Sequence, residues 1–220
     1  MALPTYLELV NDILVRLREP EVTTVQENTL SKLIGKLVND SKRQVEDAYN
    51  WNALTATLTA VTEANTFNYG LTGVGQRFKV IDVFNHTSKV RMQPRSTTAM
   101  NALFLKGGTT PAIGSPIYYN FNGLTAQGDT QIDVFPVPTS AETLFFNLYV
   151  PQDKLSADSD ALYVPSEPVI LGAFARALVE RGEDGGLNSS EAYALYKSSL
   201  ADAIAVESSR YVEEETWEVV

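Results

Sequence analysis

Helix-like sequence occupies both ends of this chain, and strand-like sequence fills the middle. Residues 3–51 and 166–211 each read as a helix, a turn and a second helix, because their apolar residues recur every three or four positions. Between them, apolar residues often alternate with polar ones. Each helical hairpin must bury an apolar face, and the other hairpin is the most economical partner. We therefore predict an α+β fold, in which N- and C-terminal helical hairpins form a four-helix bundle that carries an inserted antiparallel β sandwich or barrel-like module.

This pattern also predicts where the parts of the chain begin and end. We expect residues 1–52 and 166–210 to form the helical bundle and residues 53–165 to form the β module. The last ten residues, 211–220, combine three consecutive glutamates with apolar side chains and differ from the helix before them. We interpret this segment either as a frayed terminus or as an arm that docks on a partner chain.

Cap residues and breakers define the first hairpin. Thr5 followed by Glu8 has the spacing of a capping box, and Glu19-Pro20 predicts the end of the first helix. The second helix has two candidate starts, at Thr24 or at Asn28. Within it Gly35 predicts a close packing contact, because glycine otherwise weakens a helix. Trp51 follows the helix, where its ring could seal the junction to the next module.

The second hairpin carries similar signals. Ser166 is the expected cap of its first helix, with Pro168 in the first turn. A glycine-rich turn after Arg181 separates the two helices, and Asn188 is the expected cap of the last one. Residues 151–165 read as an irregular return segment.

Short strands separated by turn residues are predicted in the middle region. Asn122-Gly123 is a strong hairpin signal because both residues tolerate positive φ, and residues 85–88 are a second expected turn. A short helix is expected around residues 97–105. The candidate strands begin at Thr55 and continue at residues 77–84, 89–93, 116–121, 130–135 and 143–150.

The composition restricts the chemistry that this chain can perform. It has no cysteine, which excludes disulfides, thiolate catalysis and cysteine-ligated metals. Its single histidine, His86, lies in an expected turn, so a histidine relay or a multi-histidine metal site is excluded. Asp153, Asp158 and Asp160 lack the glycine and the terminal glutamate of an EF-hand loop. We expect no enzyme activity, cofactor or metal, although sequence alone leaves open a hydrolytic pair of carboxylates.

Charge restricts the partners. The formal net charge of −10 argues against affinity for nucleic-acid phosphates or an anionic membrane surface. The second helix carries four cations that could cradle DNA, but acidic residues lie among them and favour a solvated face. These cations are Lys32, Lys36, Lys42 and Arg43. No stretch approaches the ~18 apolar residues of a membrane span, and no signal peptide is visible.

The first fifty residues resemble a known family. The run Glu8–Leu14, followed by Leu17, Glu19-Pro20 and Val22, resembles the first helix and turn of phage head-to-tail adaptor (connector) proteins, which are similar to the tail tubular protein A of T7-like phages. The second helix, from Asn39 to Trp51, continues that likeness. The later hairpin matches only in kind, through a helix pair near the C-terminus.

The resemblance implies a structural virion protein made in the host cytoplasm and located in the neck between capsid and tail. Twelve copies of such an adaptor form a ring between the portal protein and a downstream nozzle or tubular tail protein. DNA passes through the lumen of the ring without specific binding. The C-terminal arm in this family embraces the portal, a role that would fall here on Tyr211, Val212, Trp217, Val219 and Val220.

One alternative function remains open from the sequence. The β insert could recognise a glycan or a protein ligand as a non-enzymatic binding module, since aromatic residues of strands 116–121 and 143–150 could stack on a ligand. At alternating strand positions, however, these side chains more often pack in a core. The C-terminal arm favours the adaptor, because a simple ligand binder does not need it.

Overall fold

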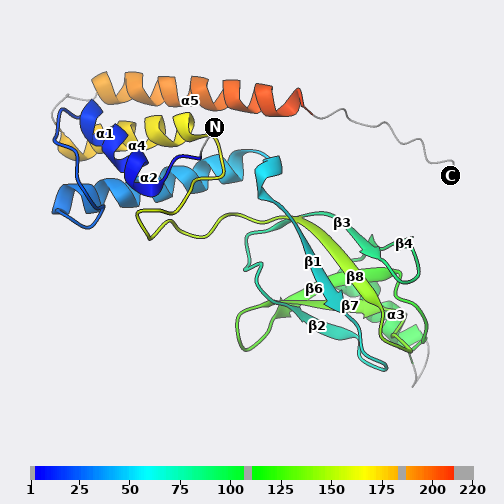
Figure 1. Cartoon of the computed structure of the whole chain (residues 1–220). Helices are drawn as coiled ribbons and strands as arrows, with labels where there is room; N and C mark the ends of the chain where they lie inside the picture. Colours follow the sequence, from blue (N-terminus) through cyan, green and yellow to red (C-terminus); the bar gives the residue numbers. More distant parts are fainter. Residues whose placement is uncertain (1–2, 107–110, 183–186, 211–220) are drawn as a thin grey trace. The chain divides into compact units, whose positions relative to one another are not determined.

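The computed structural model describes residues 3–106, 111–182 and 187–210 (Figure 1). The fold is mixed α+β, and the chain divides into two compact units. One unit joins Met1–Leu54 to Gln152–Val220, and the other comprises Thr55–Pro151.

Helix α1 (Tyr6–Arg16) begins at the predicted capping box. The Thr5 hydroxyl accepts a hydrogen bond from the Glu8 amide, and the Glu8 carboxylate accepts one from the Thr5 amide at 2.7 Å. The helix ends before the predicted stop at Glu19-Pro20. The reason is the backbone of Arg18, which adopts a left-handed conformation (φ 60°) and turns the chain out of the helix.

Helix α2 (Thr29–Ala48) begins after Asn28, so the second of the two candidate starts is the one used. The Asn28 side chain accepts a hydrogen bond from the Ser31 amide at 2.8 Å, and the Ser31 hydroxyl accepts one from the Asn28 amide. Thr24 lies in the loop before this cap.

Helices α4 (Ser166–Arg181) and α5 (Leu187–Ser208) form the second hairpin. Ser166 is already the first residue of α4, and no side chain caps this helix, so the predicted serine cap was wrong. Gly182 ends α4 in the left-handed conformation (φ 63°), as expected for a turn that the helix does not cross. Asn188 lies inside the first turn of α5 rather than before it.

Two glycines show how the helices approach one another. A Cβ on Gly35 of α2 would collide with the hydroxyl of Tyr6 from α1. A Cβ on Gly172 of α4 would meet Ser41 of α2 and Tyr196 of α5, each at 3.1 Å. The middle of α4 therefore lies between α2 and α5, and the close contact predicted at Gly35 is confirmed.

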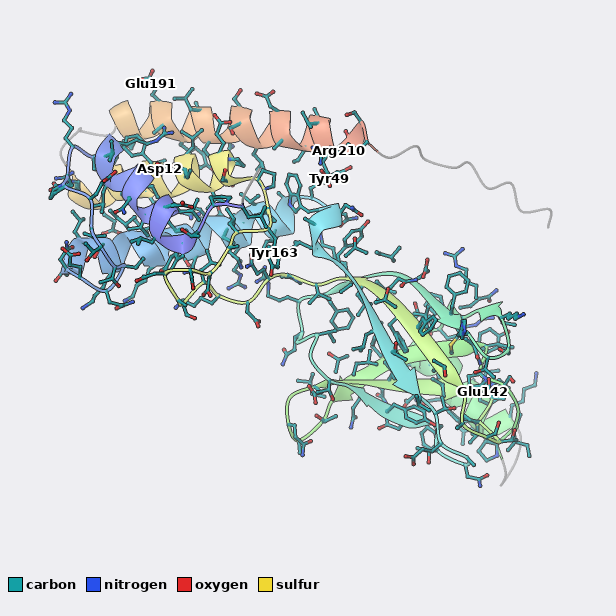
Figure 2. All side chains as sticks on the ribbon, in the orientation of Figure 1. Asp12, Tyr49, Glu142, Tyr163, Glu191 and Arg210 are labelled. Carbon is teal, nitrogen blue, oxygen red and sulfur yellow. The ribbon has the colours of Figure 1, made fainter. Side chains whose placement is uncertain are left out.

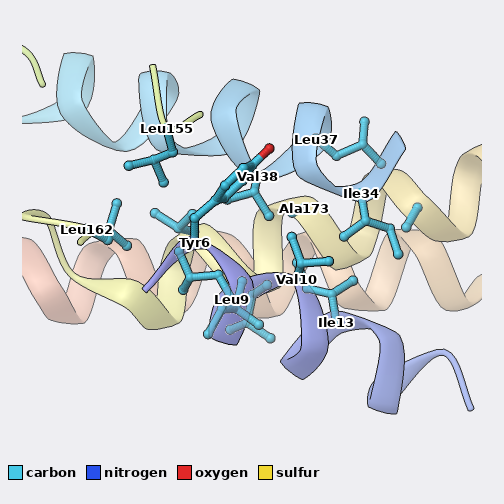
Figure 3. Packing of buried hydrophobic residues seen from close by; sticks show 14 of the residues in the cluster. Tyr6, Leu9, Val10, Ile13, Ile34, Leu37, Val38, Leu155, Leu162 and Ala173 are labelled. Atoms are coloured by element: carbon cyan, nitrogen blue, oxygen red, sulfur yellow. The ribbon is translucent and has the colours of Figure 1, made fainter. Parts of the chain in front are cut away.

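The helical unit has one apolar core, to which all four helices contribute. Charged residues such as Asp12 of α1 and Glu191 of α5 remain exposed (Figure 2). Trp51 is buried in this core, and its indole N–H donates to the carbonyl of Val45 at 2.6 Å. Figure 3 shows part of this core, which includes Tyr6, Leu9, Val10, Ile13, Ile34, Val38 and Ala173.

The irregular segment 152–165 packs with the helices, whereas the sequence analysis had assigned it to the β module. Leu155 and Leu162 of this segment are buried in the helical core (Figure 3). The Asn39 side chain of α2 makes two hydrogen bonds to the backbone of Leu155. Its amide group donates to the Leu155 carbonyl at 3.1 Å, and its oxygen accepts from the Leu155 amide at 2.9 Å. This segment belongs to neither sheet, so side chains of the helices satisfy backbone hydrogen-bonding groups that a sheet would otherwise pair.

Two four-stranded sheets make up the other unit, with strand orders β1-β8-β3-β4 and β2-β7-β6-β5. All neighbours are antiparallel except β5 and β6, which are parallel. The first sheet comprises β1 (Thr55–Val61), β8 (Thr143–Tyr149), β3 (Lys79–Asn85) and β4 (Val90–Arg91). The second comprises β2 (Asn68–Leu71), β7 (Thr130–Phe135), β6 (Tyr118–Leu124) and β5 (Gln93–Pro94).

Side chains from both sheets share one core. Helix α3 (Thr97–Lys106) packs on β6 and β7, burying Met100. The ring of Phe104 on this helix contacts Phe67 and Phe135 edge to face or tilted. The sheet residues of the core are Leu71, Val83, Tyr119, Ile132, Val134, Leu144, Phe146 and Leu148.

Two details of the strand prediction were wrong. Asn122-Gly123 does not form the hairpin turn but lies within β6, at a register shift against β7. Gly123 supplies the positive φ (88°) for this bulge, while the turn itself follows at residues 125–128. The expected strand 89–93 is split between the two sheets as β4 and β5, with Met92 buried between them.

Among the described residues, no helix combines the length and the apolar character needed to cross a membrane.

Candidate interaction surfaces

Hydrogen bonds within the helical unit fix the chain at the two positions where it leaves this unit and returns to it. The Lys42 ammonium donates to the carbonyl of Gln152 at 2.6 Å, and the Gln152 amide donates to the Glu46 carboxylate at 3.1 Å. At the other crossing, the amide of Asn52 donates to the carboxylate of Glu207 at 3.0 Å. Charged side chains of α2 and α5 therefore fix the chain just before and just after residues 55–151.

A groove runs between the start of α4 and the second half of α5 and encloses about 600 Å³. Its lining includes Pro168 and Leu171 from α4 and Leu195, Ala203 and Val206 from α5. Leu195 and Val206 are more than half exposed in this groove. The arrangement provides an apolar floor large enough for a few side chains of a partner.

The rim of this groove is acidic. Glu167 in the first turn of α4 and Asp202 of α5 are exposed on it. Glu207 also lines the groove, but its carboxylate is engaged by Asn52 and by Arg210 at 3.1 Å. Arg210, at the end of α5, is the single cation of the described lining (Figure 2).

Exposed cations lie on α2, where the acidic residues Asp40 and Asp47 are also exposed. Lys32, Lys36 and Arg43 are exposed and make no ion pair with any residue in the described ranges. Lys42, which the sequence analysis grouped with them, is instead buried and paired with Glu46. The three exposed cations share one edge of the helix with exposed Asp40 and Asp47, so this edge is cationic only in its first turns, at Lys32 and Lys36.

A smaller hollow of about 370 Å³ lies near the opposite end of α5. Arg176 crosses it from α4 and donates to the hydroxyl of Ser41 at 2.7 Å. Tyr193 lines it on α5, and the ammonium of Lys197 lies 5.1 Å from the centre of that ring. Arg176 thus links α4 to α2 and serves the packing of the helices.

The outer face of the β1-β8-β3-β4 sheet carries a polar ladder. The Thr57 hydroxyl donates to the Asn147 oxygen, and the Asn147 amide group donates to Asp82, both at 2.6 Å. Beside this ladder, Phe84 is opposite Phe145 in register, and the His86 ring lies 4.7 Å from that of Phe145. His86 therefore lies in the expected turn and stacks on the sheet.

The aspartates of segment 152–165 hold backbone amides. Asp158 accepts a hydrogen bond from the amide of Val25 at 3.0 Å. Asp160 accepts from the amides of Ser156 and Ala157 at 2.7 and 2.8 Å, and these bonds lower the pKa of its carboxyl. No cluster of three or more metal-ligating side chains occurs in the part of the chain that the structure describes.

The portal-binding residues expected at the C-terminus lie outside the described residues. These are Tyr211, Val212, Trp217, Val219 and Val220. The surface features found instead are the acidic groove and the cations of α2. The groove was not visible from sequence, because its residues come from two helices, and the sequence showed the cations but not the burial of Lys42.

The fold is that of a mixed α+β protein with a helical unit and a two-sheet unit. The family model described as SU10 adaptor protein matches residues 4–216. The chain therefore belongs to the SU10 adaptor protein family, whose members are phage head-to-tail adaptors and virion structural proteins rather than enzymes. No curated protein matches the sequence.

Proposed function

We propose that this chain forms a ring in the neck of the virion, between the portal protein and a downstream nozzle or tubular tail protein. The family match over residues 4–216 carries this proposal. The number of copies would be twelve, as the resemblance to tail tubular protein A of T7-like phages implies. The four helices would act as a bundle and the two-sheet unit as a module inserted into it.

The net charge of −10 suits the passage of DNA through the lumen of such a ring. An acidic wall repels phosphates, so DNA would slide past without binding. The hydrogen bonds at Asn52 and Gln152 support an inserted β unit. They fix both ends of the inserted segment to the helices, so the sequence of the β unit can vary without disturbing these ends.

The C-terminal segment 211–220 would be the arm that contacts the portal. Trp217 is the largest apolar side chain of this segment, and Val212, Val219 and Val220 flank it. A tryptophan that inserts into a pocket of a partner contributes strongly to binding.

Binding of the purified protein to the portal protein of the same phage tests this function. We expect the full chain to bind, a chain truncated after Arg210 to bind at least tenfold more weakly, and Trp217→Ala to lie between them. A chain with Leu105→Ala, an exposed apolar side chain of α3, is the control and should bind normally. Full binding by the truncated chain would overturn the role of the arm, and absence of binding by the full chain would overturn the adaptor function.

A further inference from the structure

The helical unit presents two surfaces of opposite charge, one at the start of α2 and one between α4 and α5. A Cβ on Gly172 of α4 would meet both Ser41 of α2 and Tyr196 of α5, so α4 packs closely against both of these helices. The exposed cations Lys32 and Lys36 lie on α2. The acidic groove lies between α4 and α5. A surface and its electrostatic complement thus belong to the same chain but lie apart from each other.

We infer that the cationic edge of α2 from one copy docks in the acidic α4–α5 groove of the next copy. This inference rests on the proposed ring and names the contact that builds it. A contact between two different surfaces of identical chains is head-to-tail, and it closes into a ring when the rotation per copy divides a full turn. A two-fold symmetric dimer would place both surfaces of each copy in one interface and would stop at two copies.

Charge identifies the occupant. Glu167 and Asp202 are exposed on the rim, and neither forms an ion pair within the described residues. The C-terminal segment of the same chain fits this rim poorly, since it contains the run Glu213-Glu214-Glu215. Like charges in one interface are unfavourable, whereas lysines opposite these carboxylates attract them.

Exposed apolar side chains are present on both surfaces of the inferred contact between copies. Leu33 lies between Lys32 and Lys36 in the sequence and is 36 % exposed, while Leu195 and Val206 are 54 % and 55 % exposed in the groove. Burial of these side chains between copies would remove apolar surface from water, and the charges around them would fix the register.

Site-specific crosslinking tests the contact directly, because the chain has no cysteine of its own. One cysteine is introduced by Leu33→Cys and another by Ser198→Cys on the groove. The doubly substituted chain, concentrated and treated with a short bis-maleimide, should give a ladder of covalent oligomers. Each single variant should stop at a dimer. Absence of a ladder from the double variant would overturn the inferred contact, and the portal-binding assay would still test the adaptor function separately.

Charge reversal in the same crosslinking background adds a second readout. Lys32→Glu/Lys36→Glu and Glu167→Lys/Asp202→Lys should each slow ladder formation at least tenfold. A mixture of the two variants should restore it, because each reversed surface then meets its complement on the other chain. Asp12→Lys/Glu191→Lys changes the charge as much as the groove variant but lies outside the groove lining, and should have no effect.

Two further controls keep the result interpretable. Glu167→Gln/Asp202→Asn is a milder groove variant that should slow the ladder even if lysine at the start of α4 disturbs the helix. Labelling of Ser198→Cys by a maleimide should be the same in the full chain and in a chain truncated after Arg210. A ladder unaffected by charge reversal, or faster labelling after truncation, would assign the groove to another occupant and overturn the inference.

Discussion

Lys42 and Glu46 form an ion pair inside the helical unit, with 2.8 Å between the ammonium nitrogen and one carboxylate oxygen. Their side chains are 4 % and 0 % exposed. The second carboxylate oxygen of Glu46 has no hydrogen-bond partner among the described residues. Both groups also bind the backbone of Gln152, so the pair anchors the chain where it re-enters the helical unit after Pro151.

Removal of one partner of this pair should destabilise the helical unit strongly. We expect Lys42→Met to lower the free energy of unfolding by about 3–5 kcal/mol, because it leaves the charge of Glu46 buried and unpaired. Urea unfolding followed by the fluorescence of buried Trp51, in a Trp217→Phe background, measures this loss. Lys42→Met/Glu46→Leu should be more stable than the single variant. Equal midpoints for the single variant and the parent would contradict the buried pair.

The two helix glycines should respond differently to alanine. We expect Gly35→Ala to destabilise the protein by about 1–3 kcal/mol, since the new methyl group collides with Tyr6 and lies 2.8 Å from Val25. Gly172→Ala should be close to neutral, because its contacts at 3.1 Å need only small shifts and alanine favours a helix. Thermal unfolding of both variants compares them. The reverse order would show that α1 and α2 pack less closely than described.

A buried polar network should stabilise the β unit. The Glu142 carboxylate accepts hydrogen bonds from Asn85 at 2.5 Å and from Ser115 at 2.9 Å. We expect Glu142→Ala to destabilise this unit by about 1.5–3 kcal/mol, because the buried amide group of Asn85 loses its hydrogen bond to a charged acceptor and keeps only the longer one to the Pro116 carbonyl at 3.3 Å. Both tryptophans lie outside residues 55–151, so amide hydrogen exchange within β3 and β8 is the appropriate measurement. Unchanged exchange there would contradict this role, and unchanged Trp51 fluorescence is the internal control.

Asp160 should make stability depend on acid pH. Backbone amides lower the pKa of its carboxyl, so its contribution is complete above the ordinary pKa of aspartate and is lost as the pH falls through the lowered value. We therefore expect Asp160→Asn to be less stable than the parent at neutral pH, and the difference to vanish in acid. Urea unfolding over a pH series measures it, with Asp12→Asn of α1 as the control. A difference that grows toward acid would contradict the assignment.

The sequence predicted the helices well because their signals are local. The capping box of Thr5 and Glu8 and the glycine after Arg181 act within a few residues of the element that they bound. The buried state of Lys42 and Glu46 was not predictable, because an i,i+4 pair of opposite charges is usually a surface feature. Burial here depends on Gln152, which is more than a hundred residues away along the chain.

The β unit was harder to predict for a similar reason. Strand β2 was missed because Asn68–Leu71 contains a glycine and buries only Leu71. It is held by Asp133 of β7, which accepts hydrogen bonds from Asn68 and from Asn122. The candidate docking groove could not be found at all, because its rim joins Glu167 and Asp202 from two different helices.

Electron microscopy of the purified protein together with the portal protein of its phage tests the central claim most directly. The adaptor function predicts rings of this chain, coaxial with the portal and in contact with it, and the docking inference places α2 of each copy at the α4–α5 groove of its neighbour. A portal that remains bare, or single copies bound without contact to one another, would contradict the account.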